Sequence, residues 1–94
     1  MILFTIRMKV FAEKHKELSQ TIALLIGAIK AEKGCRRCEF YQSMENENGL
    51  CILEEWDTWK NLDRHLNSGH FTVLRGAKSL LQEPYETGVW DGRD

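Results

Sequence analysis

The first ten residues alternate between apolar and polar positions with a period of two. Polar side chains separate most of the apolar ones, which are Ile2, Phe4, Ile6, Met8 and Val10. Successive side chains of a β-strand point to opposite faces of the sheet. The alternation therefore predicts a strand over residues 2–10 that buries one face.

A helical period replaces this alternation from about residue 13 to residue 33. The apolar positions now recur at intervals of four, three and four residues, at Leu18, Ile22, Leu25 and Ile29. This spacing places them on one face of an amphipathic helix. Gly34 follows, and glycine most readily adopts the left-handed conformation that ends a helix. We therefore predict a helix over residues 13–33 that Gly34 terminates.

The second half of the chain predicts a hairpin, two short helices and a last strand. The runs "CEFYQSM" and "LCILEEW" flank the turn-forming stretch "ENENG", which favours an antiparallel hairpin with its loop near residues 46–49. A short helix is expected over residues 58–67, and a second one after Ser68, which is a suitable N-cap. The segment "EPYETGVWD" predicts a final strand, with Pro84 at its start or on an edge.

The order strand, helix, strand, strand, helix, strand predicts the α+β class. It is typical of the ferredoxin-like split β-α-β fold, a four-stranded antiparallel sheet with its helices on one side. No repeat or linker interrupts the chain, so residues 1–94 are interpreted as a single domain. The face that the helices leave open carries apolar side chains, and a second copy of the chain is the simplest cover for it. We therefore expect a homodimer with its sheets face to face.

Composition and charge narrow the possible partners. Hydrophobic residues make up 43% and charged residues 29% of the 94 residues, as in a folded globular protein. The formal net charge is -1, with both signs mixed along the chain, which argues against nucleic acid or an anionic membrane as a partner. The apolar N-terminal stretch contains Arg7 and Lys9 and is too short to span a bilayer. A cytoplasmic protein is expected.

Three cysteines, an odd number without a secretory signal, favour a reducing compartment over a disulfide framework. Cys35 and Cys38 form a C-x-x-C motif in the predicted second strand. Residues three apart in a regular strand point to opposite faces, so these thiols are not expected to share a metal or a disulfide. No metal site is predicted.

Two histidines flank the break between the short helices. His65 lies beside Leu62 and Leu66, near the face expected to meet the sheet. It is either a histidine at the margin of the core or a general base, because an imidazole with a pKa of about 6.5 titrates near working pH. His70 lies in the first turn of the next helix, where it either packs at the corner or takes part in catalysis.

The end of the third strand combines an acid with an indole. Glu54 and Trp56 share the parity of Ile52, so all three side chains are expected on one face. A buried carboxylate requires a partner or a function, because burial of an unpaired charge is costly. Trp56 is suited either to plain core packing or to stacking on a flat aromatic ligand.

Three segments together resemble the antibiotic biosynthesis monooxygenase family, whose members include quinol and anthrone monooxygenases. They are "EKGCRRCEFYQS", "ILEEWDTWKNLDRHLNSGHF" and "EPYE". Cys38 stands where an aromatic is common in the family, and the tail after Glu86 is short. The positions that match the family pattern are Gly34, Cys35, Glu39, Tyr41, Glu54, Trp56, His65, Leu66, Ser68, His70 and Phe71.

This resemblance implies a dimeric α+β barrel that oxidises a small electron-rich aromatic with O2 and without any cofactor. It implies catalytic roles for His65, Trp56 and His70. The residues implied to contact the substrate are Glu54, Tyr41, Phe71 and Leu66.

Two other functions remain open. One alternative is a non-catalytic dimeric module that binds a small hydrophobic ligand, because fold does not determine function. A less favoured alternative is haem degradation. Relatives with that activity have an Asn in the first strand and a further His midway along the last helix, and this sequence has neither.

Overall fold

The computed structural model describes residues 1–92, and its strands and helices follow the predicted order. A short 3-10 helix, η1 (Ala12–Lys14), precedes the first α-helix. Another, η2 (Ala77–Leu80), follows the last one. The main elements are β1 (Ile2–Lys9), α1 (His15–Lys30), β2 (Cys35–Gln42), β3 (Gly49–Trp56), α2 (Trp59–Leu66), α3 (Gly69–Gly76) and β4 (Glu86–Asp91).

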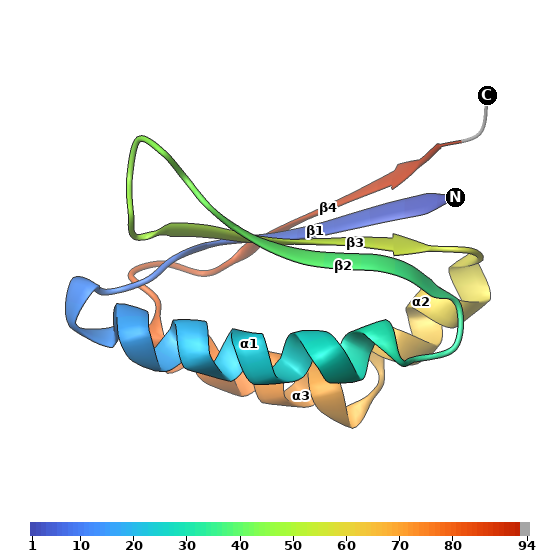
Figure 1. Cartoon of the computed structure of the whole chain (residues 1–94), viewed down its shortest axis with the longest axis horizontal. Coiled ribbons are helices and arrows are strands. Elements are labelled where there is room, and N and C mark those ends of the chain that lie inside the picture. The colour runs from blue at the N-terminus through green and yellow to red at the C-terminus, as the bar shows by residue number, and fades with distance from the viewer. Residues whose placement is uncertain (93–94) are drawn as a thin grey trace.

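The four strands form one antiparallel sheet in the order β2-β3-β1-β4. Figure 1 shows the helices together on one face of this sheet, with the other face left open. This arrangement confirms the predicted ferredoxin-like α+β fold. In residues 1–92 we find no helix with the length and apolar character needed to cross a membrane.

The core lies between the sheet and the helices. The even-numbered side chains of β1 are buried, as the alternation predicts, and they face the apolar side of α1. Full burial of a large aliphatic side chain contributes roughly 1.5–3 kcal/mol. The buried residues of α1 are Leu18, Ile22, Leu25 and Ile29.

The end of α1 differs from the prediction. The helix ends at Lys30, because the Ala31 N–H donates to the Ala28 carbonyl oxygen at 3.2 Å and so tightens the last turn. Gly34 lies four residues later with φ +87°, in the turn that leads into β2. It therefore directs the chain into the second strand, and it is not the residue that caps the helix.

The open face of the sheet is partly apolar. Leu3 and Leu53 are half-buried there, and the Trp90 side chain on β4 is 54% exposed. The indole of Trp90 lies across Gly88, where a Cβ atom would overlap the ring. Gly88 therefore allows the indole to lie flat on the open face.

Candidate active site

The end of β3 directs an acid and an indole into the core. Glu54 and Trp56 alternate with half-buried residues along the strand, and both are 0% exposed. They lie on the same face as Ile52, which confirms the predicted parity. The Trp56 Nε1–H donates to Glu54 Oε1 at 2.9 Å. The buried carboxylate therefore has a partner on its own strand.

Helix α2 brings His65 onto this pair. Thr58 caps the helix, because its Oγ1 accepts a hydrogen bond from the Asn61 N–H at 3.2 Å. The imidazole is 0% exposed and stacks on the Trp56 indole, with ring centroids 4.8 Å apart and planes at 26°. His65 Nε2 lies 3.1 Å from Glu54 Oε1 but is not aligned for a hydrogen bond, so this contact is an ion pair.

Glu32, which the sequence analysis did not single out, joins the two histidines. Its Oε2 lies 3.0 Å from His65 Nδ1 and 2.9 Å from His70 Nδ1. Ser68 caps α3 by accepting the Phe71 N–H, and this cap places His70 in the first turn. Glu32 is 33 and 38 residues from its partners, so no local pattern indicates the contact.

The protonation state of His65 follows from its neighbours. Each ring nitrogen faces a carboxylate oxygen, and an unprotonated nitrogen would direct its lone pair at that oxygen. Burial disfavours the imidazolium, but the carboxylates of Glu54 and Glu32 outweigh burial and raise the pKa of His65 above its usual value. Both acids therefore favour the protonated, positively charged form of His65.

One oxygen of the buried acid remains free. Glu54 Oε2 is buried and has no hydrogen-bond partner among residues 1–92. A buried acceptor of this kind carries a desolvation cost of about 1–3 kcal/mol unless something donates to it. The site can therefore accept a hydrogen bond, or a proton, from a bound molecule.

The raised pKa of His65 predicts that stability falls with pH. A group whose folded pKa lies above its unfolded value of about 6.5 stabilises the fold fully below that pH. The stabilisation is lost as the pH rises through the folded pKa. We expect the free energy of unfolding, measured with urea, to decrease between about pH 6.5 and 8, below the usual cysteine pKa of about 8.5. A His65→Gln variant should show a flatter profile, and stability that rises with pH in wild type would contradict the assignment.

Helix α3 supplies Phe71 to the site. The Phe71 ring meets His65 edge-on at 5.6 Å, and the Arg75 guanidinium covers it at 4.8 Å. Arg75 also donates to the Leu66 carbonyl oxygen at 3.0 Å. The Leu66 side chain is half-buried against the core.

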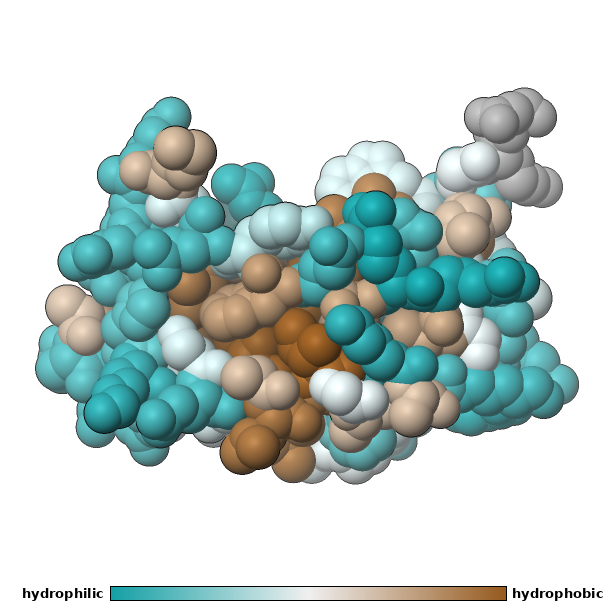
Figure 2. All heavy atoms as spheres, in the orientation of Figure 1, coloured by the Kyte–Doolittle hydropathy of each residue, from teal (hydrophilic) through white to brown (hydrophobic). Residues whose placement is uncertain are grey.

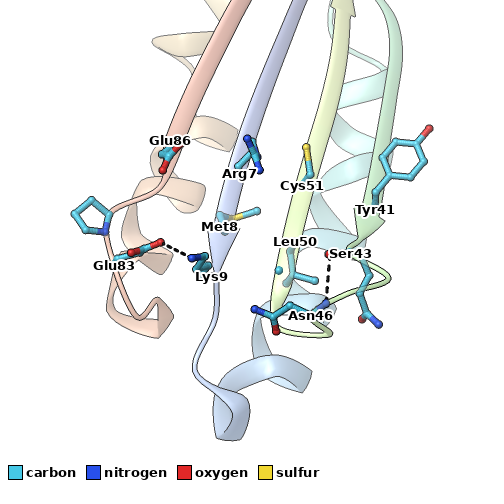
Figure 3. Close-up of a pocket in the computed structure, with 13 residues that line it drawn as sticks. Arg7, Met8, Lys9, Tyr41, Ser43, Asn46, Leu50, Cys51, Glu83 and Glu86 are labelled. Atoms are coloured by element: carbon cyan, nitrogen blue, oxygen red, sulfur yellow. Dashed lines mark hydrogen bonds and ion pairs between the residues drawn. The ribbon is translucent and has the colours of Figure 1, made fainter.

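Tyr41 lies elsewhere. It projects from the open face of β2, is 46% exposed and lines a cavity of about 320 Å³. Figure 3 shows this cavity between the strand ends, with Tyr41 and Cys51 on one side and Glu83 and Glu86 on the other. Tyr41 and His65 of this chain are therefore on opposite faces of the sheet.

The structure corrects the prediction that the two cysteines of the C-x-x-C motif point to opposite faces of the sheet. The register of β2 shifts between Cys35 and Arg37, so Cys35 pairs with Trp56 and Cys38 pairs with Glu54. An extra residue in a strand reverses the parity beyond it, and both thiols therefore face the helices. Burial, followed by the charge of Glu54, raises the pKa of Cys35 to about 11 and that of Cys38 to about 12. No group of three or more potential metal ligands occurs in the described part of the chain.

The structure thus brings together His65, Trp56, His70, Glu54 and Phe71, and it adds Glu32. Leu66 is next to this group in sequence, and Tyr41 is outside it. The roles of these residues stay predictions.

Comparisons with solved structures find the same fold in several organisms. A conserved protein from Methanosarcina mazei Go1 superposes with a TM-score of 0.92 at 29% identity, covering 98% of this chain and 92% of that chain. The protein Rv0793 from Mycobacterium tuberculosis gives 0.91 at 24% identity, covering 99% and 95%. A Nitrosomonas europaea protein, provisionally described as an antibiotic biosynthesis monooxygenase, gives 0.91 at 18% identity, covering 98% of each chain.

The sequence itself gives the family. No curated protein matches the chain. A family model described as antibiotic biosynthesis monooxygenase matches residues 1–76, which include β1, the C-x-x-C motif and all the side chains of the buried cluster. The chain therefore belongs to the antibiotic biosynthesis monooxygenase family.

Proposed function

We propose that this chain is an oxygenase that oxidises a small electron-rich hydroxyaromatic, of the quinol or anthrone type, with O2 and without a cofactor. Membership of the family supports an oxygenase role. The observation that carries the proposal is the free Oε2 of Glu54, which is buried beside the Trp56 indole and the His65 imidazolium.

In this proposal Glu54 is the base. The substrate hydroxyl gives its proton to Glu54 Oε2, and the resulting aromatic anion passes one electron to O2. The Trp56 N–H and the His65 imidazolium stabilise negative charge at the site, and such preorganised groups are most effective where water is excluded. Positioned acid-base catalysis contributes roughly a hundred- to ten-thousandfold.

The proton on Glu54 is used again in the same turnover. The substrate radical and superoxide combine to a peroxide anion, which takes the proton back from Glu54, and the resulting hydroperoxide loses water to leave the oxidised product. His65 does not relay this proton, because the imidazolium already carries one on each ring nitrogen. The proposal thus assigns the role of general base to Glu54. The candidates from the sequence were His65 and His70.

Oxygen uptake tests this function. We expect the wild type to consume O2 with one or more members of a panel of quinols and anthrones. His65→Ala and Trp56→Phe should each lower kcat about tenfold or more, because each removes a group that contacts the reacting acid. His15→Ala and Trp59→Phe are matched controls outside the cluster and should retain the activity. Uptake that the first two variants leave intact would refute the site.

The burial of the cluster favours a second candidate, the non-catalytic binding module. Glu54, Trp56 and His65 are all 0% exposed, and neither of the two cavities described here is lined by them. A dimer that binds a small hydrophobic molecule elsewhere needs no access to these groups. Saturable binding of the same panel without any O2 uptake would favour this alternative.

We further propose that a second copy covers the open face of the sheet. Its half-buried Leu3 and Leu53 and its exposed Trp90 provide an apolar centre, and charged residues surround it. An isologous two-fold contact would bury this area on both copies.

Sedimentation measures the predicted assembly. At micromolar concentration the wild type should sediment at twice the chain mass. Leu53→Glu should sediment as a monomer, because it places a charge in the apolar centre of the interface. Leu24→Glu, at an 82% exposed position on α1, is the matched control and should stay dimeric. A monomeric wild type would contradict this part of the proposal.

A further inference from the structure

A second cavity lies at the edge of the sheet, where α1 ends and β2 begins. Its volume is about 450 Å³, and its lining residues are Lys30, Cys35, Arg36, Arg37, Cys38 and Glu39. In Figure 2 apolar surface gathers on the side of the molecule that α1 and β2 form, and hydrophilic side chains border it on the right, toward the end of α1. Four of the six lining residues are charged, and the two cysteines form the rest of the lining.

The inner wall of this cavity adjoins the buried cluster. Cys38 lines the cavity and neighbours Glu54 across the β2–β3 pair, as Cys35 neighbours Trp56. The carboxylate lies close enough to raise the pKa of both thiols. Since Glu54 Oε2 has no hydrogen-bond partner among residues 1–92, the acceptor that lacks a donor lies next to this wall.

The rim has a net positive charge. Arg37 Nε is already paired, at 2.7 Å from Glu39 Oε1 and 3.3 Å from Glu55 Oε1. Lys30 and Arg36 form no ion pair within residues 1–92, although Arg36 is near enough to Asp57 to contribute to its lowered pKa. Two cations thus remain for a ligand that carries an anionic group.

We propose that this cavity binds a small aromatic carboxylic acid that also carries a ring hydroxyl. The carboxylate pairs with Lys30 and Arg36 at the rim, and the ring lies against the thiols. Glu54 is 0% exposed and does not line the cavity, so the Cys38 side chain turns aside for the hydroxyl to donate to Glu54 Oε2. This inference rests on the proposed function for the statement that the bound molecule is oxidised. Among the hydroxyaromatic substrates of that function, it selects those that also carry a carboxylate. Binding is measurable without turnover.

An NMR titration of the full chain under nitrogen tests the inference. The probes are 2,5-dihydroxybenzoate, hydroquinone, which lacks the carboxylate, and benzoate, which lacks the hydroxyls. We expect 2,5-dihydroxybenzoate to shift the amides of residue 30 and residues 35–39 and to bind about tenfold more tightly than either analogue. Arg36→Gln should weaken its binding about three- to tenfold and leave hydroquinone unaffected. Arg64→Gln, at an exposed position on α2, is the matched control and should bind like wild type.

The outcomes separate this inference from the proposed function. Equal affinity for the three probes, or amide shifts confined to the 320 Å³ cavity around Tyr41, would overturn the inference while O2 uptake could still support the oxygenase. Selective binding of the acid at residues 35–39 without any O2 uptake would support the inference and refute the oxygenase.

Discussion

Replacement of Glu54 by leucine is expected to lower the free energy of unfolding by about 3–5 kcal/mol. The substitution leaves the His65 imidazole and the Trp56 N–H buried without the acid that now pairs with both. The substitution leaves the Nε2 side of the buried imidazolium without an acid, while Glu32 still faces Nδ1, and this loss costs more than the pair itself contributes. A domain of this size has roughly 5–15 kcal/mol of stability, so the loss should be clear in urea unfolding.

Two comparisons separate this effect from a general loss of a carboxylate. The double variant Glu54→Leu/His65→Leu should be more stable than Glu54→Leu alone, because it removes the uncompensated imidazole as well. Glu17→Leu removes an exposed acid that lies 3.8 Å from Lys14 and should cost less than about 1 kcal/mol. If the leucine variant does not fold, Glu54→Gln provides the same measurement with the shape retained. A change within about 1 kcal/mol for either Glu54 variant would contradict the buried ion pair.

The strands and helices were predictable because burial of one face gives the apolar residues a regular spacing along the chain. The alternation in β1 and the interval pattern from Leu18 to Ile29 both reappear as buried faces. The predicted cap at Ser68 follows from side-chain chemistry that acts over three residues, and such local signals are visible in a sequence.

The site was predictable only in part. Parity alone places Glu54 beside Trp56, and the helix face places His65 toward the sheet. The β2 bulge was not predictable, because it depends on how the strand pairs with β3, and it reverses the facing of Cys38. Glu32 was missed because its contacts join three segments that only the tertiary fold brings together.

A substitution at Gly34 should show how strongly the turn before β2 supports the site. Gly34 has φ +87°, and a Cβ there would overlap Asp57 Oδ1 and Asn61 Nδ2, which form a 2.8 Å hydrogen bond at the start of α2. The left-handed conformation costs an L-residue about 1–2 kcal/mol, and disruption of that bond adds to the loss. We expect Gly34→Ala to lower the free energy of unfolding by about 2–4 kcal/mol in urea titration.

Gly27 offers a control of opposite sign on the same chain. It lies inside α1, and a Cβ there meets nothing within 4 Å. Glycine in a helix interior is less favourable than alanine by about 0.5–1 kcal/mol, so Gly27→Ala should stabilise the protein by that amount. The turn at Gly34 follows Glu32 by two residues and precedes Cys35 by one, so its distortion should also disturb the acid that joins the two histidines. Equal effects of the two substitutions would show that the turn at Gly34 is not constrained.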